Sequence, residues 1–194
     1  MLPQKRKQIL EITEKLFNRF GIRKTGVDDI AKHANVAKGT IYNYFGDKEG
    51  LFNELIKCKL RGFDEFLENT FSRITDPVTR IKVTLIGYLK VSINNPFLSD
   101  TMLHHKNEDK IRLFRRELEN RSSKMIEKIL NNSYLKDLPQ EQKSSINNTL
   151  LFLLRGMDDA IRNQFDQVSL RRFEKEIDFL INAILPPRSI ESNN

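Results

Sequence analysis

The sequence has 194 residues and a formal net charge of +7, with 39% apolar and 30% charged residues. This length and apolar content are sufficient to bury a core in one or two domains. No run of about 18 apolar residues occurs, so no membrane span is predicted. One cysteine, Cys58, excludes an intramolecular disulfide framework, and the basic N-terminus lacks the apolar core of a signal peptide. These features predict a cytoplasmic protein.

The excess positive charge is concentrated in the N-terminal third of the chain. Residues 1–62 contain 13 Lys and Arg against 7 Asp and Glu, a net charge of +6, whereas the remaining residues carry only +1. A basic segment of this kind attracts a polyanion such as DNA. A solvated basic surface is the alternative interpretation, but it does not explain why the excess stops near residue 62.

The first predicted element is a helix from Lys5 to Phe20, in which apolar residues recur at helical spacing. Gly21 follows and is expected to adopt a left-handed conformation at the end of this helix. Thr25 is predicted as the N-cap of a second helix, with Asp28 completing a capping box three residues later.

The second and third predicted helices are short and separated by a tight turn. Asn35 tolerates a left-handed conformation and is expected to end the second helix, and the third extends over Lys38–Tyr44. Gly39 is unfavourable inside this third helix unless another molecule must approach it closely. Two short helices joined in this way are typical of a helix-turn-helix, whose second helix lies in the DNA major groove.

Six further helices are predicted from the apolar periodicity, and turn residues separate them. Asp47 is expected to cap the first of them. The last one has apolar residues at alternating spacings of three and four, a pattern that is typical of a helix-packing seam. The predicted ranges are 48–71, 77–93, 97–104, 108–130, 140–165 and 170–184.

No catalytic constellation is present: the sequence has no nucleophile elbow, phosphate-binding glycine loop or paired-carboxylate motif. His104, His105, Glu108 and Asp109 offer metal-ligand spacing if they share one continuous helix. An exposed loop is the preferred interpretation, because Asn107 and a change of segment interrupt the pattern. No catalytic residue, metal or cofactor is predicted.

Residues from about Lys7 to Phe52 resemble the DNA-binding domain of the tetracycline-repressor (TetR) family. The segments Thr25–Ile30, Ala34–Phe45 and Lys48–Glu49 match the pattern of that family most closely. The resemblance implies an all-α regulator of about nine helices and not an enzyme. The expected domains are a helix-turn-helix DNA-binding domain over 1–47, a helical ligand-binding and dimerisation domain over 48–188, and a disordered tail over 189–194.

The resemblance also implies which residues contact DNA. Hydroxyl, ammonium and backbone groups of this segment are expected on phosphates, and base reading is expected mainly from Thr40, Asn43 and Lys38. Ile41 and Phe45 are expected to face the small core instead. The expected DNA contacts are Thr25, Lys38, Gly39, Thr40, Tyr42, Asn43, Tyr44 and Lys48.

Two residues depart from the family pattern. Ala37 occupies the position of a serine that usually caps the recognition helix, and losing such a cap typically costs about 1 kcal/mol. Gly50 occupies the position of a glutamate that usually completes a capping box with the residue matching Asp47. Both departures are expected to weaken helix starts without changing a base-reading position.

For the remainder of the chain the resemblance implies a homodimer and a small-molecule effector, with a palindromic operator as the DNA partner. The last two helices are expected to pair with their copies through Leu150, Leu153, Met157, Leu170, Phe173, Ile177, Leu180 and Ile184. The residues expected to line the effector site are Phe63, Phe66, Tyr88, Met102, Phe114, Met125, Phe152 and Arg155.

The predicted function is a repressor that a ligand releases from its operator. For each single residue of the expected effector site, a place in the ordinary core is the alternative, and Arg155 has the alternative of pairing with an acidic neighbour. For the whole protein, the alternatives are an architectural DNA-binding protein without a ligand and, remotely, an enzyme on a helical scaffold.

Overall fold

The computed structural model describes residues 4–98, 105–162 and 170–186. Within these residues the protein consists of eight α-helices and one 3-10 helix, which confirms the predicted all-α class. The helices are α1 (Gln4–Lys24), α2 (Val27–His33), α3 (Lys38–Phe45), α4 (Lys48–Phe71), α5 (Pro77–Ile93), η1 (Pro96–Leu98), α6 (His105–Asn131), α7 (Gln140–Arg162) and α8 (Leu170–Ile184).

The helix bounds agree closely with the prediction, and α4 begins and ends where its apolar periodicity does. Between α5 and α6 a helix is predicted over 97–104. The 3-10 turn η1 includes the first two of these residues, and the remainder of the prediction is not tested. Residues 99–104 lie outside the described ranges.

The chain forms two compact units that interleave along the sequence. Unit 1 comprises Met1–Gly62 and Asn94–Phe114, and unit 2 comprises Phe63–Ile93 and Arg115–Asn194. The two long helices α4 and α6 therefore contribute residues to both units. The predicted boundary after residue 47, between a DNA-binding domain and a ligand-binding domain, is not tested by these compact units and stays a prediction.

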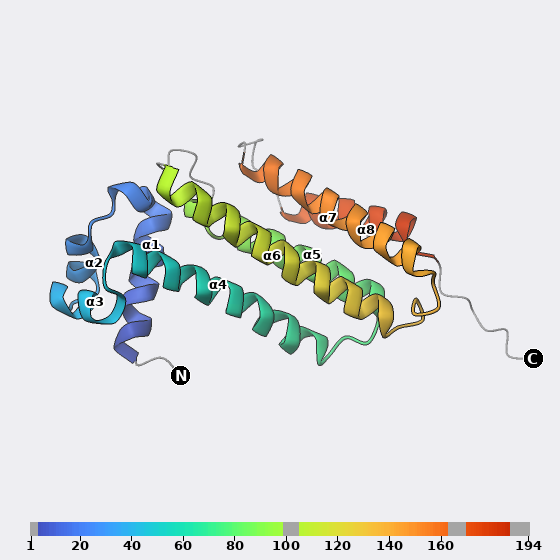
Figure 1. Ribbon diagram of the computed structural model, residues 1–194, viewed down its shortest axis with the longest axis horizontal. Helices are drawn as coiled ribbons and strands as arrows, with labels where there is room; N and C mark the ends of the chain where they lie inside the picture. Colours follow the sequence, from blue (N-terminus) through green and yellow to red (C-terminus); the bar gives the residue numbers. More distant parts are fainter. Residues whose placement is uncertain (1–3, 99–104, 163–169, 187–194) are drawn as a thin grey trace, which may run out of the picture. The chain divides into compact units, whose positions relative to one another are not determined.

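Unit 1 is built around α1, which packs against α2 and η1, while α2 packs against α3 (Figure 1). Its core contains Phe17 from α1 and Phe52 from α4, both almost completely buried. Phe97 of η1 lies between them, with ring centroids 6.0 Å from Phe17 and 6.2 Å from Phe52. A residue far along the chain thus completes the aromatic core of the N-terminal helices.

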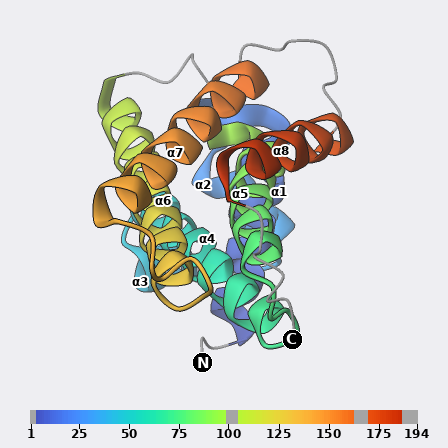
Figure 2. The same ribbon diagram turned by 90° about the vertical axis from the view of Figure 1, so that its right-hand side faces the viewer.

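Unit 2 is organised around α5, which packs against both α7 and α8 (Figure 2). Most of the α5 side chains in the middle of this helix are buried, as its apolar sequence requires. Gly87 lets α4 approach closely, because a Cβ at this position would lie 2.9 Å from the Phe66 ring and 3.2 Å from the Phe63 ring. None of the described helices is long and apolar enough to cross a membrane.

Candidate nucleic-acid interface

Backbone hydrogen bonds and one left-handed residue hold the segment from α2 to α3. The amide of Ala34 donates to the carbonyl of Ile30 at 2.9 Å, which closes the end of α2. Asn35 then reverses the chain with φ of 51°, which confirms its predicted role. Ile41 and Phe45 are buried, also as predicted, so the opposite side of α3 faces outward.

The outward side of α3 carries five of the eight predicted DNA-contact residues. The side chains of Tyr42 and Tyr44 are 42% and 38% exposed. Asn43 is exposed and Thr40 is half-buried. Gly39 is open to solvent, because a Cβ built there meets no atom within 4 Å. Two phenols, an amide, a hydroxyl and a bare stretch of backbone are therefore presented together on one short helix.

The start of α3 brings a cation beside this surface. Ala37 is the N-cap and makes no side-chain hydrogen bond, as its methyl group predicts. The ammonium of Lys38 lies 2.7 Å from the Asp28 carboxylate of α2. The hydrogen bond with Asp28 raises the pKa of the Lys38 ammonium above its usual value. Lys38 therefore stays charged, and it must leave Asp28 if it is to contact a phosphate or a base.

The start of α2 differs from the prediction. Gly26 and not Thr25 is the N-cap, and its amide donates to the Asp29 carboxylate at 3.0 Å, whereas the sequence predicts Asp28 in that role. Thr25 is only 2% exposed, and its hydroxyl donates to the carbonyl of Gly21 at 2.8 Å. This hydroxyl is used inside the domain, so a phosphate contact at Thr25 would have to come from its backbone.

The start of α4 is capped as predicted, because the Gly50 amide donates to the Asp47 carboxylate at 2.7 Å. The expectation that Gly50 weakens this helix start is wrong. A Cβ at Gly50 would overlap the carbonyl oxygen of Phe45, so the tight turn between α3 and α4 requires a glycine here. A glutamate at this position would not fit the observed backbone.

Lys48, the last of the predicted DNA contacts, is partly buried at the first position of α4. Its ammonium donates to the carbonyl of Arg23 at 3.3 Å, and burial lowers the pKa of this ammonium. Lys48 therefore joins the start of α4 to the end of α1. The sequence places Lys48 correctly just after α3, but it does not indicate the hydrogen bond between Lys48 and Arg23.

An open pocket of ≈ 740 Å³ lies in unit 2. Residues from the end of α4 to the start of α5, and from the end of α6 into the turn after it, line the pocket, among them Phe71, Arg80 and Tyr134. The Arg80 guanidinium is held in place, because its Nε donates to the carbonyl of Ile74 at 2.7 Å. Of the residues predicted to line an effector site, Met125 is the one found on this pocket.

The other residues predicted for the effector site have different surroundings. Phe152 is 74% exposed, so it does not line the interior, which corrects the prediction. Arg155 is also exposed and pairs with Glu119 at 2.8 Å, which is the alternative that the sequence left open. Phe63, Tyr88 and Phe114 are buried, Phe66 is 36% exposed, and Met102 lies outside the described residues.

The residues predicted for a dimer interface mostly belong to the core of unit 2. Leu150, Met157, Phe173 and Ile177 are buried within the single chain, so this part of the prediction is corrected. They face inward because α7 and α8 both pack on α5. Leu153, Leu180 and Ile184 are partly exposed, and the side chain of Leu170 lies outside the described residues.

Two phenylalanines that the predicted interface omits lie on the outer sides of the same helices. Phe152 of α7 is 74% exposed and Phe179 of α8 is 75% exposed. Each is followed four residues later by an exposed small residue, Gly156 or Ala183. Phe179 interrupts the polar side of α8, and this break in the pattern is the signal in the sequence that identifies it.

A metal site receives no support from the described part of the chain, which contains no group of three or more His, Cys, Asp or Glu residues placed to hold an ion. His104 lies outside the described residues, and so do the side chains of His105 and Glu108. The metal alternative is therefore not tested, whereas the preferred interpretation as an exposed loop is wrong for residues 105–109, which belong to α6.

Comparison with known proteins identifies the N-terminal segment. The family model described as bacterial regulatory proteins of the tetR family matches residues 9–55, the region of α1 to the first turns of α4. The HTH-type transcriptional regulator HbdR of Aromatoleum sp. (strain CIB) is 30% identical over 132 residues, which cover 66% of this chain. The matched stretch spans 57% of the length of HbdR.

Solved structures extend the similarity of the fold over nearly the whole chain. The fatty acid degradation regulator FadR from Bacillus halodurans superimposes with a TM-score of 0.68 at 22% identity, covering 97% of this chain and 100% of that one. FadR from Bacillus subtilis, solved in complex with stearoyl-CoA, has a TM-score of 0.69 at 19% identity and covers 93% and 99%. At these identities the likeness concerns the fold alone. The N-terminal segment is therefore similar to the DNA-binding segment of the TetR family, and the chain shares the fold of these solved regulators.

Proposed function

We propose that this protein regulates transcription by binding duplex DNA through the exposed side of α3. The observation that best supports the proposal is the composition of that side, where Tyr42, Asn43 and Tyr44 project from a helix whose other side is buried. The second helix of a helix-turn-helix enters the major groove, and residues near its N-terminus meet base edges. Amide and hydroxyl side chains are suited to reading those edges.

Gly39 gives independent support to this proposal. A glycine near the start of an eight-residue helix lowers its stability, by up to about 1 kcal/mol relative to alanine. The fold does not require it, because a Cβ there would meet no atom within 4 Å. Close approach of a DNA backbone to the start of α3 is a physical reason for the missing side chain.

The proposal includes a homodimer that binds a palindromic operator. Phe152 and Phe179 are exposed apolar side chains that a partner chain would bury. Each has a small residue one helical turn away, Gly156 or Ala183. A Cβ at Gly156 would meet no atom of this chain within 4 Å, so the space beside Phe152 is open to a partner helix. Two-fold symmetry would place equivalent faces against each other and would duplicate the DNA-binding unit.

The proposal further includes a small-molecule effector that releases the protein from DNA. The pocket of ≈ 740 Å³ in unit 2 lies within the range of about 300–1,000 Å³ that is usual for ligand sites. The FadR structure from Bacillus subtilis provides a precedent for a ligand in this fold, since it was solved with stearoyl-CoA. Such an effector acts if it binds the conformation with low DNA affinity more tightly than the other. A cytoplasmic location, where bacterial DNA lies, is part of the same proposal.

The proposal is tested by selecting sequences from a random duplex library at about physiological salt, where specific and non-specific binding separate. We expect enrichment of an inverted repeat. The double variant Tyr42→Ala/Asn43→Ala should bind the selected duplex at least about 10-fold more weakly, because the lost base contact of Asn43 costs about 1–3 kcal/mol and the lost contact of Tyr42 adds to it. Asn120→Ala, which removes an exposed amide of unit 2 that does not line the pocket, is the control and should bind normally.

Two results would contradict this proposal. Recovery of no enriched sequence, with many weak sites bound equally, would favour an architectural DNA-binding protein. Normal affinity of the folded α3 variant would show that α3 does not read the DNA.

A further inference from the structure

The elbow between α1 and α2 presents two cations on a rigid support. Gly21 has φ of 79° and ψ of 158°, which interrupts α1 and turns its last residues aside. Ile22 and Thr25 on either side are each only 2% exposed, so both ends of the elbow are anchored in the core. Arg23 and Lys24 between them are exposed. Their backbone is therefore fixed while their side chains reach into solvent.

The elbow lies against the start of α4, directly after the predicted DNA-reading helix. The ammonium of Lys48 donates to the carbonyl of Arg23 at 3.3 Å, and Lys48 follows the last residue of α3, Phe45, by only three positions. Arg23 and Lys24 therefore belong to the same corner of unit 1 as the end of α3. Lys48 itself is partly buried and uses its ammonium to hold this corner together.

The charges of the elbow are not neutralised by the surrounding residues. Some cations of unit 1 have carboxylate partners: Arg6 pairs with Glu54 at 3.3 Å, and Lys38 pairs with Asp28. Within the described ranges, no carboxylate comes within ion-pair distance of Arg23 or Lys24. An exposed pair of cations on a fixed backbone is suited to binding an anion with little loss of conformational freedom.

We propose that Arg23 and Lys24 form a phosphate-binding corner that contacts the DNA backbone beside the groove occupied by α3. This inference rests on the proposed DNA-binding function and adds to it two contacts at positions that the sequence does not indicate. Lys48 then acts chiefly as the tie that positions the corner. Contacts of this kind orient the protein on any duplex and carry no sequence information.

The test uses the full-length protein and a fluorescein-labelled duplex of 30 base pairs with mixed sequence, because phosphate contacts do not depend on an operator. Dissociation constants are measured by anisotropy from 50 to 200 mM salt. Each phosphate contact contributes about 0.9 to the slope of log affinity against log salt. The variant Arg23→Gln/Lys24→Gln should bind more weakly, with a slope shallower by about 1.8 for each DNA-binding unit engaged.

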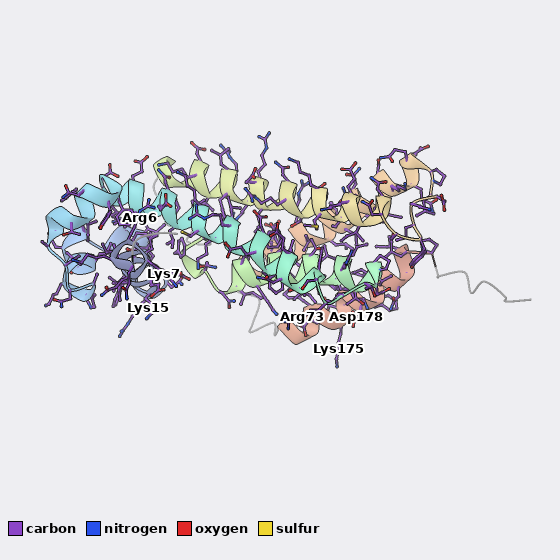
Figure 3. The ribbon with its side chains drawn as sticks, turned by 90° about the horizontal axis from the view of Figure 1, so that it is seen from below. Arg6, Lys7, Lys15, Arg73, Lys175 and Asp178 are labelled. Carbon is purple, nitrogen blue, oxygen red and sulfur yellow. The ribbon has the colours of Figure 1, made fainter. Side chains whose placement is uncertain are left out.

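The matched control is Arg73→Gln/Lys175→Gln, which removes the same two residue types from exposed positions of unit 2. Both residues are labelled in Figure 3, where Lys175 extends away from α8. The control should keep the salt dependence of the wild type.

The outcomes separate this inference from the function on which it rests. A slope for the elbow variant equal to that of the wild type would overturn the corner but leave DNA binding intact. Failure of the wild-type protein to bind the duplex would overturn both. Equal losses in the elbow and control variants would show a general effect of net charge and would also overturn the corner.

Discussion

Gly39 and Gly50 lie near the starts of consecutive helices, and their surroundings differ. A side chain at Gly39 would enter open space, whereas one at Gly50 would overlap the carbonyl oxygen of Phe45. Gly50 therefore serves the fold through the close turn from α3 to α4. Gly39 has no such role within the described chain, which is consistent with the proposed approach of DNA to the start of α3.

Replacement of Gly50 by alanine should destabilise the protein by about 2 kcal/mol, since overpacking against fixed atoms typically costs about 1–3 kcal/mol. Urea denaturation monitored by circular dichroism measures this change. Gly62→Ala is the control, because Gly62 lies within the same helix and a Cβ there meets nothing within 4 Å. We expect Gly62→Ala to stabilise the protein by about 0.5–1 kcal/mol through its higher helix propensity. Equal effects of the two variants would contradict the close approach at Gly50.

At the scale of single helices, short-range sequence signals predict most bounds. The break before α5 is an example: Asp76 precedes Pro77, and its carboxylate accepts hydrogen bonds from the amide of Thr79 at 2.7 Å and from the hydroxyl of Thr79 at 2.5 Å. All three residues lie within one turn, so the sequence alone indicates the helix start. Burial by itself would raise the pKa of the Asp76 carboxyl, but the hydrogen bonds from Thr79 hold this pKa below its usual value.

The N-cap at Asp76 should therefore contribute a pH-dependent part of the stability. A carboxyl whose pKa is lowered in the folded state stabilises the fold fully above its unfolded pKa of about 3.9, and this contribution is lost as the pH falls through the folded pKa. Asp76→Ala should cost about 1 kcal/mol near pH 7. Urea denaturation at several pH values should show the difference from wild type shrinking below about pH 4.

Asp76→Asn is the control for the charge, because asparagine retains the ability to cap a helix without an ionisable group. Its stability relative to Asp76→Ala should stay nearly constant across this pH range. A difference between wild type and Asp76→Ala that does not change at low pH would contradict the lowered pKa.

At the scale of the whole molecule, the exposed sides of α7 and α8 indicate where the proposed homodimer interface lies. Phe152 and Phe179 are about three-quarters exposed in the single chain, whereas the apolar seam around Ile177 is buried against α5. Exposed phenylalanines on two neighbouring helices are costly in water, and a second copy of the chain would cover them. The dimer surface is therefore proposed on the side of each helix opposite to the seam that the sequence suggests.

Phe152→Asp and Phe179→Asp should each weaken dimerisation at least about 100-fold, because a charge would be buried at the centre of the interface. Sedimentation equilibrium measures the change, and helical content should be retained since both side chains are exposed. Leu113→Asp is the control, because Leu113 is 60% exposed and belongs to unit 1. Wild-type dimerisation of both phenylalanine variants would place the interface elsewhere.

The sequence by itself determined most of the helix bounds, the left-handed turn at Asn35 and the buried side of α3, because each depends on residues within one or two helical turns. The basic character of the N-terminal third was likewise visible from composition. These local signals sufficed to predict the helix-turn-helix and most of the residues on its exposed side.

Only the tertiary structure decided which distant segments meet. It placed Phe97 between two N-terminal phenylalanines, bound Lys48 to the elbow at Arg23, and turned the seam of α8 inward while leaving Phe179 exposed. The physical reason is that helical periodicity shows that one side of a helix is apolar but does not show whether α5, another segment or a second chain covers it.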